Sequence, residues 1–114
     1  MSAGPEILTR LHAAIQARQG ADPASSYTAK LFSRGVKKIA QKVGEEAVET
    51  ALAAVSADPV ETVREETVKE SADLLYHLLV LWTALGIEPD AVFQELARRE
   101  GISGIAEKNA RPKG

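Results

Sequence analysis

The sequence predicts an all-α protein of four to five helices, in which a long antiparallel helix pair forms the centre of a bundle. Hydrophobic residues make up 45% of the 114 residues but aromatic residues only 4%, which favours helices over a β-sandwich. Apolar residues recur at helical spacing, and no segment alternates with the period of a strand. We expect a single domain over 1–114, because a chain of this length leaves no room for a second.

The first third of the chain predicts two helices. Apolar residues at helical spacing follow Pro5 and predict a helix to about Arg18. Gly20 ends it, and residues 20–26 have the composition of a loop. A short helix is then expected over 27–33.

The long helix pair is expected over 36–57 and 59–85, with Gly86 ending the second helix. The segment 58–61 (DPVE) predicts a capping box in which Asp58 is the N-cap and proline takes the first helical position. The short turn makes the two helices antiparallel. In the first helix the expected apolar stripe consists of Val36, Ala40, Val43, Ala47, Ala51 and Ala54.

The second helix of the pair is apolar on nearly every face over 74–82, which an isolated monomer of this size would struggle to bury. We therefore expect a bundle completed by dimerisation, with a second copy of the chain covering part of this helix. A last helix is expected after Glu88-Pro89 to about Glu100, and the tail after about residue 108 is expected to be frayed.

Composition excludes several classes of function. The 14 basic and 16 acidic side chains give a net charge of −2, so a general nucleic-acid binder is not expected. The absence of cysteine excludes disulfides, thiolate zinc sites and cysteine nucleophiles. The N-terminus carries no secretory signal pattern, and the most apolar run (74–85) is shorter than the roughly 20 residues of a membrane span. We expect a cytoplasmic protein without a membrane partner.

Two pairs of acids stand out on the long helices. Glu46 and Glu49 are three residues apart and share a helix face, as do Glu70 and Asp73. At about 1.5 Å per residue all four lie roughly 14–22 Å from the turn, within about one and a half helical turns of each other. Four carboxylates at one level cannot all ionise without a cation, so we expect them to bind Mg²⁺ or Mn²⁺. The alternative is that these acids are ordinary solvated surface residues.

Basic residues precede the acids, and a histidine follows them. Residues 23–44 contain no acid but carry Lys30, Arg34, Lys37, Lys38 and Lys42. A cationic strip leading to a metal site suits a polyphosphate substrate, although it could also be a solvated face on which Lys42 only pairs with Glu46. His77 could be a metal ligand, an acid–base group or a phosphate contact. We favour a supporting role, hydrogen bonded to Asp73 or to a backbone carbonyl.

These residues resemble a known family. Residues 42–49 (KVGEEAVE) and 70–80 (ESADLLYHLLV) resemble phosphoribosyl-ATP pyrophosphatases, and the pattern Glu-x-x-Glu, a 20-residue spacer and Glu-x-x-Asp is that of the wider MazG-like all-α nucleotide pyrophosphohydrolases. Residues 26–32 (SYTAKLF) and 101–108 (GISGIAEK) add to the resemblance to the narrower family, which covers most of 25–110.

The resemblance implies an enzyme that hydrolyses phosphoribosyl-ATP to phosphoribosyl-AMP and pyrophosphate, the second step of histidine biosynthesis. It implies Mg²⁺-assisted attack of water between the α and β phosphates, with Mn²⁺ as a possible substitute, and a homodimer. The metal ligands it implies are Glu46, Glu49, Glu70 and Asp73.

The resemblance also suggests roles for residues around the metal ligands. Glu45 or Glu49 would accept the proton of the attacking water, and Lys42 would contact phosphate. Arg34, Lys30 and His77 are further candidates for substrate binding. Two alternatives stay open: a housecleaning pyrophosphatase of non-standard or deoxy nucleoside triphosphates, and a non-enzymatic helical interaction module.

Overall fold

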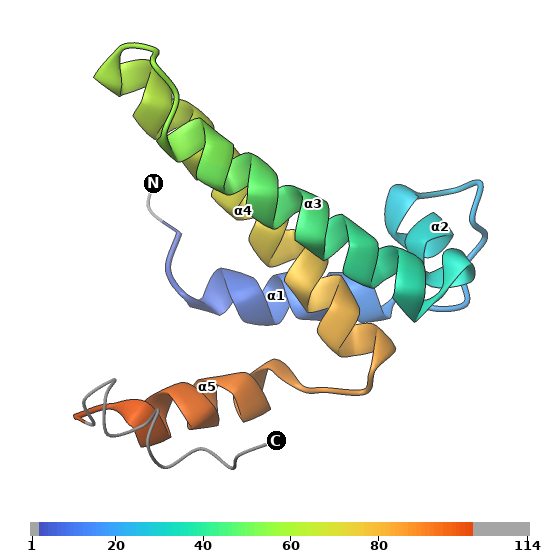
Figure 1. The fold of residues 1–114 in the computed structure, drawn as a ribbon. Helices are drawn as coiled ribbons and strands as arrows, with labels where there is room; N and C mark the ends of the chain where they lie inside the picture. Colours follow the sequence, from blue (N-terminus) through green and yellow to red (C-terminus); the bar gives the residue numbers. More distant parts are fainter. Residues whose placement is uncertain (1–2, 102–114) are drawn as a thin grey trace, which may run out of the picture.

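The computed structural model describes residues 3–101, and helices form most of this range (Figure 1). They are α1 (Glu6–Gln16), α2 (Tyr27–Arg34), α3 (Val36–Ala54), α4 (Val60–Ala84) and α5 (Pro89–Arg99). No strand occurs within the described residues, so the predicted all-α class and its long helix pair are confirmed. The expected frayed tail lies outside the described residues.

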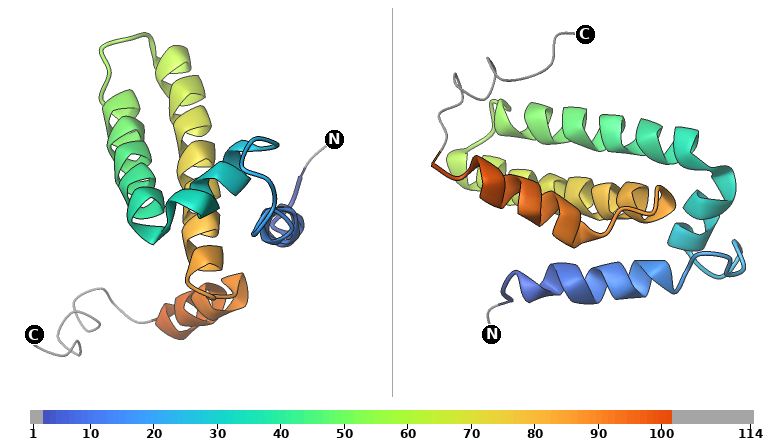
Figure 2. Two further views of the ribbon diagram at one scale, coloured as in Figure 1. Left: turned by 90° about the vertical axis from the view of Figure 1, so that its right-hand side faces the viewer. Right: turned by 90° about the horizontal axis from the view of Figure 1, so that it is seen from below.

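Helices α3 and α4 form an antiparallel hairpin and lie side by side along its length in every view (Figures 1 and 2). Helix α3 ends at Ala54, three residues earlier than expected. The predicted capping box at the start of α4 is wrong, since Pro59 is the N-cap and no side chain caps the helix. The Asp58 carboxylate instead accepts a hydrogen bond from Ser56 Oγ at 2.7 Å, so it stabilises the turn and does not cap the helix.

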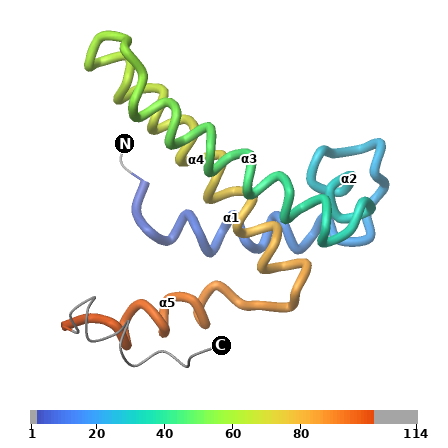
Figure 3. Tube along the Cα trace, viewed as in Figure 1, coloured from blue at the N-terminus to red at the C-terminus, as the bar shows by residue number. Residues whose placement is uncertain are grey.

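The apolar core lies at one end of this hairpin. Its buried members are Ile15 of α1, Leu31 of α2, Ile39 of α3, and Leu79 and Val80 of α4. These positions bring α1 and α2 against the beginning of α3 and the last turns of α4. The other end of the hairpin projects beyond the remaining helices, as the Cα trace shows clearly (Figure 3).

The predicted apolar stripe of α3 does not face the core. Among its six positions only Val43 is even half-buried, and the remaining five are exposed. The face that packs on α4 contains Ile39 and Glu46, both buried, and the half-buried Ala53. Helical periodicity is satisfied by both rows, and the small alanines bury little area, so the row that contains isoleucine turns inward. This rotation carries the acids of α3 towards α4.

The apolar half of α4 is covered largely within the chain. His77, Leu79, Val80 and Thr83 are buried, whereas Leu75 is 47% exposed. None of the helices in the described part of the chain is both long and apolar enough to cross a membrane.

Candidate active site

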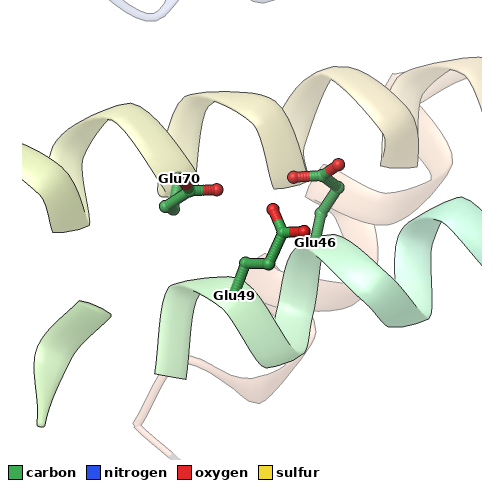
Figure 4. A group of neighbouring side chains, drawn as sticks. All are labelled: Glu46, Glu49 and Glu70. Carbon is green, nitrogen blue, oxygen red and sulfur yellow. The ribbon is translucent and has the colours of Figure 1, made fainter. Parts of the chain in front are cut away.

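Three carboxylates meet between α3 and α4. Glu46 and Glu49 project from successive turns of α3 towards α4, and Glu70 lies opposite them (Figure 4). One oxygen of each side chain lies within 4.8 Å of the corresponding oxygens of the other two. The hairpin thus brings together three of the four acids predicted from their distance to the turn. We call these three residues the acid cluster.

The acid cluster is electrostatically strained. Burial, followed by the neighbouring Glu49 carboxylate, raises the pKa of Glu46 above its ordinary value of 4.5, and the same two causes raise the pKa of Glu70. Glu46 Oε2 and Glu70 Oε2 are buried and have no hydrogen-bond partner among the described residues. Unpaired buried oxygens that repel one another are a donor set for a hard divalent cation, so the residues present fit Mg²⁺.

Asp73, the fourth predicted ligand, lies outside the group of three. Its side chain is exposed, although its charge adds to the raised pKa values of both Glu46 and Glu70. It therefore lies near the acid cluster, one helical turn beyond Glu70 on α4. Its assignment as a metal ligand stays a prediction.

Lys42 joins the acid cluster to Glu45. Its Nζ lies 3.8 Å from Glu45 Oε2 and 4.0 Å from Glu46 Oε1. Glu45 also accepts a hydrogen bond from Gln41 Nε2 at 3.4 Å. The amino group of Lys42 is therefore held at the edge of the acid cluster by two carboxylates, where an incoming phosphate could exchange with either.

The remaining basic residues of the strip have no acidic partner within the described range. Lys30, Arg34 and Lys37 are exposed and Lys38 is half-buried. None of them forms an ion pair with another described residue, so this part of the surface keeps its positive charge.

His77 is buried, with only 6% of its surface exposed, and both ring nitrogens are engaged. Nδ1 donates to the backbone carbonyl of Asp73 at 2.7 Å, which leaves Nε2 to accept from the hydroxyl of Tyr27 at 2.8 Å. The backbone-carbonyl contact is the supporting interaction favoured from the sequence. Direct contact of His77 with substrate would require breaking one of these bonds.

Sequence reasoning did not single out Tyr27 or its neighbour Thr28. Burial raises the pKa of the Tyr27 hydroxyl above its ordinary value of 10.0, and Lys42 lowers it while Glu46 raises it, so this tyrosine lies close to the acid cluster. The Thr28 hydroxyl forms a short hydrogen bond with the hydroxyl of Tyr76. The available signal was the motif 26–32 (SYTAKLF), which contains both residues and contributed to the family resemblance.

A cavity of about 330 Å³ adjoins the acid cluster on the side of the hairpin turn. Glu49, Glu66 and Glu70 line it together with Leu52 and Val63. The cluster is therefore open to a ligand on this side.

An antiparallel helical hairpin that gathers three carboxylates beside a lysine agrees with the class of all-α nucleotide pyrophosphohydrolases that the acidic motifs resemble. Residues 8–100 match the family model described as phosphoribosyl-ATP pyrophosphohydrolase, and the chain belongs to this family. It is therefore a hydrolase, and its reaction releases pyrophosphate from phosphoribosyl-ATP in histidine biosynthesis. The predicted family, enzyme class and reaction are confirmed.

Individual relatives support the same conclusion over nearly the whole chain. The phosphoribosyl-ATP pyrophosphatase of Azospirillum brasilense is 64% identical over 105 residues, which are 92% of this chain and 90% of the relative. The enzyme of the same name from Rhodospirillum rubrum is 60% identical over 96% of this chain and 90% of its own length. That of Paramagnetospirillum magneticum is 57% identical, with 99% of each chain covered.

Proposed function

We propose that Mg²⁺, held by Glu46, Glu49, Glu70 and Asp73, assists the hydrolysis of phosphoribosyl-ATP to phosphoribosyl-AMP and pyrophosphate, and that Mn²⁺ can substitute for it. The observation that carries this proposal is the pair of buried, unpaired oxygens on Glu46 and Glu70. Bound Mg²⁺ would polarise the phosphoryl oxygens, orient the attacking water and offset the charge of the leaving pyrophosphate.

The chain's own residues supply the proton transfer and the phosphate contacts. Water attacks at the α,β anhydride, the bridging P–O bond breaks, and one proton of the water passes to a carboxylate. Glu49 suits this role because it is exposed within the acid cluster. Glu45 is the second candidate, since Lys42 contacts both Glu45 and Glu46 of the acid cluster. Lys42 would exchange a carboxylate for a phosphate oxygen and hold the substrate against the cluster.

Lys30 and Arg34 would bind outer phosphates of the substrate. Their support is the absence of any ion pair with the described residues, together with their place on the strip that leads to Lys42. His77 would act on the substrate only through Tyr27, because both of its ring nitrogens are occupied.

The testing experiment measures pyrophosphate release from phosphoribosyl-ATP, dATP, dUTP and ATP, each with Mg²⁺, with Mn²⁺ and with EDTA. We expect fast, metal-dependent release from phosphoribosyl-ATP alone. Release from the plain triphosphates instead would move the protein to nucleotide housecleaning. Full activity in EDTA after exhaustive removal of metal would contradict the proposed metal site.

We also propose a homodimer located in the cytoplasm. The support for the dimer is a set of exposed apolar side chains on the projecting part of the hairpin, which comprises Val48, Leu52, Val55, Val60 and Val68. We call this set the hairpin patch. We assign no residue of a partner subunit to the active site.

A further inference from the structure

Tyr27 is the most exposed aromatic residue of the chain. The sequence contains two tyrosines, two phenylalanines and one tryptophan, all within the described range. Tyr27 is 52% exposed, and Phe93, the next most exposed, lies on α5 at 36%. A ligand that covers this ring removes apolar area from water, which favours binding.

The Tyr27 ring is held in place from the inside. Its hydroxyl donates to Nε2 of the buried His77 at 2.8 Å, and the two rings meet edge to face with centroids 5.8 Å apart and planes at 79°. His77 is in turn fixed by its bond to the Asp73 carbonyl. Because the polar end of the tyrosine is turned inward, the exposed part of the side chain is its ring.

The anchor also fixes where this ring lies. His77 is one turn beyond Asp73 on α4, and Tyr27 begins α2, capped by the Ser26 hydroxyl through the Ala29 amide at 2.9 Å. The ring is thereby placed against the turn of α4 that follows Asp73, where the charges of Lys42 and Glu46 act on its hydroxyl. It is a rigid, flat, uncharged surface next to the residues that would hold phosphates.

We propose that Tyr27 is a substrate-contact residue on which the purine base of the nucleotide stacks, and that His77 is a positioning residue that fixes the tyrosine ring for this contact. The proposal rests on the proposed function only in that the phosphates are taken to lie at the acid cluster and Lys42. A purine is the flat aromatic part of such a substrate, and stacking on a ring that is already fixed loses little side-chain entropy.

The test separates base binding from phosphate binding. We would measure inhibition of phosphoribosyl-ATP hydrolysis in Mg²⁺ by α,β-methylene-ATP, which carries a base, and by tripolyphosphate, which does not. Tyr27→Ala should raise the inhibition constant of α,β-methylene-ATP about 5- to 150-fold, the range given by loss of one base–aromatic stack. The inhibition constant of tripolyphosphate should stay within about twofold of the wild-type value.

Further variants distinguish the ring from its anchor. Tyr27→Phe keeps the ring and should lose much less affinity for α,β-methylene-ATP than Tyr27→Ala. His77→Asn should raise the same constant by an intermediate factor and leave tripolyphosphate unaffected. Tyr76→Phe is the matched control, since it removes a hydroxyl from the same contact between α2 and α4 while its ring is half-buried.

Equal weakening of both inhibitors by Tyr27→Ala, or weakening of neither, would overturn the proposal. Circular dichroism checks that the variant is folded; Tyr27→Leu, which keeps apolar bulk without an aromatic face, replaces it if helix content is lost. Failure of the proposed function would look different. Hydrolysis would then persist in variants that lack the acid cluster, or in the wild type without Mg²⁺.

Discussion

Glu46 lies where the apolar contact between α3 and α4 gives way to the acid cluster. The residue is 7% exposed, one of its side-chain oxygens has no partner among the described residues, and Nζ of Lys42 is 4.0 Å from the other oxygen. Burial of an incompletely paired carboxylate costs stability, and the raised pKa of Glu46 reflects that cost. Such a conflict is typical of a residue placed for a ligand rather than for folding.

The first prediction concerns the charge of this residue. Glu46→Gln should remove most of the Mg²⁺-induced rise in melting temperature and lower turnover by at least about 100-fold, since a charged ligand oxygen is lost. The metal-free variant should be at least as stable as the wild type, because a strained charge is gone. Thermal unfolding with and without Mg²⁺, combined with pyrophosphate release, measures both effects.

Glu65→Gln is the matched control for this substitution, because Glu65 is an exposed acid of α4 and forms no ion pair with another described residue. It should leave both activity and the Mg²⁺ response unchanged. Substantial turnover by the Glu46→Gln enzyme would refute the ligand assignment.

The second prediction follows from the raised pKa values of Glu46 and Glu70. The folded chain binds protons at these sites more tightly than the unfolded chain, whose carboxyls titrate near the ordinary value of 4.5. Their contribution to stability is therefore fully present below that pH and falls as the pH rises through the raised values. Metal-free wild type should lose stability with increasing pH relative to the double variant Glu46→Gln, Glu70→Gln.

Urea unfolding from pH 4 to pH 8 in EDTA measures this difference. The comparison with the double variant is needed because Glu95 acts in the opposite direction: hydrogen bonds from Arg98, then from Arg99, lower its pKa to about 2. Saturating Mg²⁺ should remove the decrease in stability of the wild type with rising pH relative to the double variant, because the bound ion favours the ionised acids. If the stability of the two metal-free proteins depended on pH in the same way, the raised pKa values of Glu46 and Glu70 would be contradicted.

Among the elements, the break between α2 and α3 depends on Gly35. This residue has φ 88° and ψ 172°, a conformation that is accessible to glycine and strained for other residues. It ends α2 and begins α3 within one residue, and so turns the basic residues of α2 towards the same end of the hairpin as Lys42.

The third prediction compares two glycines. Gly35→Ala should destabilise the protein by about 1–3 kcal/mol through backbone strain. Gly44→Ala should stabilise it by about 0.5–1 kcal/mol, because Gly44 lies inside α3 with open space at its Cβ position. Urea unfolding at one fixed protein concentration measures both. Equal effects of the two substitutions would show that the backbone conformation of Gly35 is not what matters.

The helices themselves could be predicted well because their limits are local. Gly20, Gly35 and Gly86 have positive φ and lie at or near the ends of α1, α2 and α4, as their residue type suggests. The face that α3 turns inward could not be predicted, because two rows of its residues satisfy helical periodicity and only packing against α4 chooses between them. The predicted capping box at Asp58 was wrong for a similar reason, because the Asp58 carboxylate accepts a hydrogen bond from Ser56 Oγ instead of capping α4.

The acid cluster could be predicted because a short turn fixes which levels of two antiparallel helices face each other. Glu46, Glu49 and Glu70 meet as the distances from the turn require. The position of Tyr27 could not be predicted, because its contact with His77 joins residues 50 positions apart in the sequence. Such a contact depends on how α2 packs on α4, which no local pattern encodes.

As a whole, the molecule is extended for its length. Its radius of gyration is 16.6 Å, whereas a compact domain of this length has about 13 Å. The core occupies one end of the hairpin, and the projecting end carries the hairpin patch. The sequence pointed to 74–82 as the segment in need of a partner. In the structure α4 is largely covered there, whereas the five exposed apolar side chains of the hairpin patch lie on the later part of α3, the turn and the earlier part of α4.

The last prediction locates the proposed dimer contact at the hairpin patch. Leu52→Glu should convert the dimer to a monomer, because a charge buried in an apolar interface without a partner costs several kcal/mol. Leu96→Glu on α5 is the matched control, since Leu96 is 61% exposed and Leu52 is 62% exposed. Sedimentation equilibrium across a range of concentrations measures the association. A dimer that survives Leu52→Glu but not Leu96→Glu would place the interface on α5 and leave the hairpin patch unexplained.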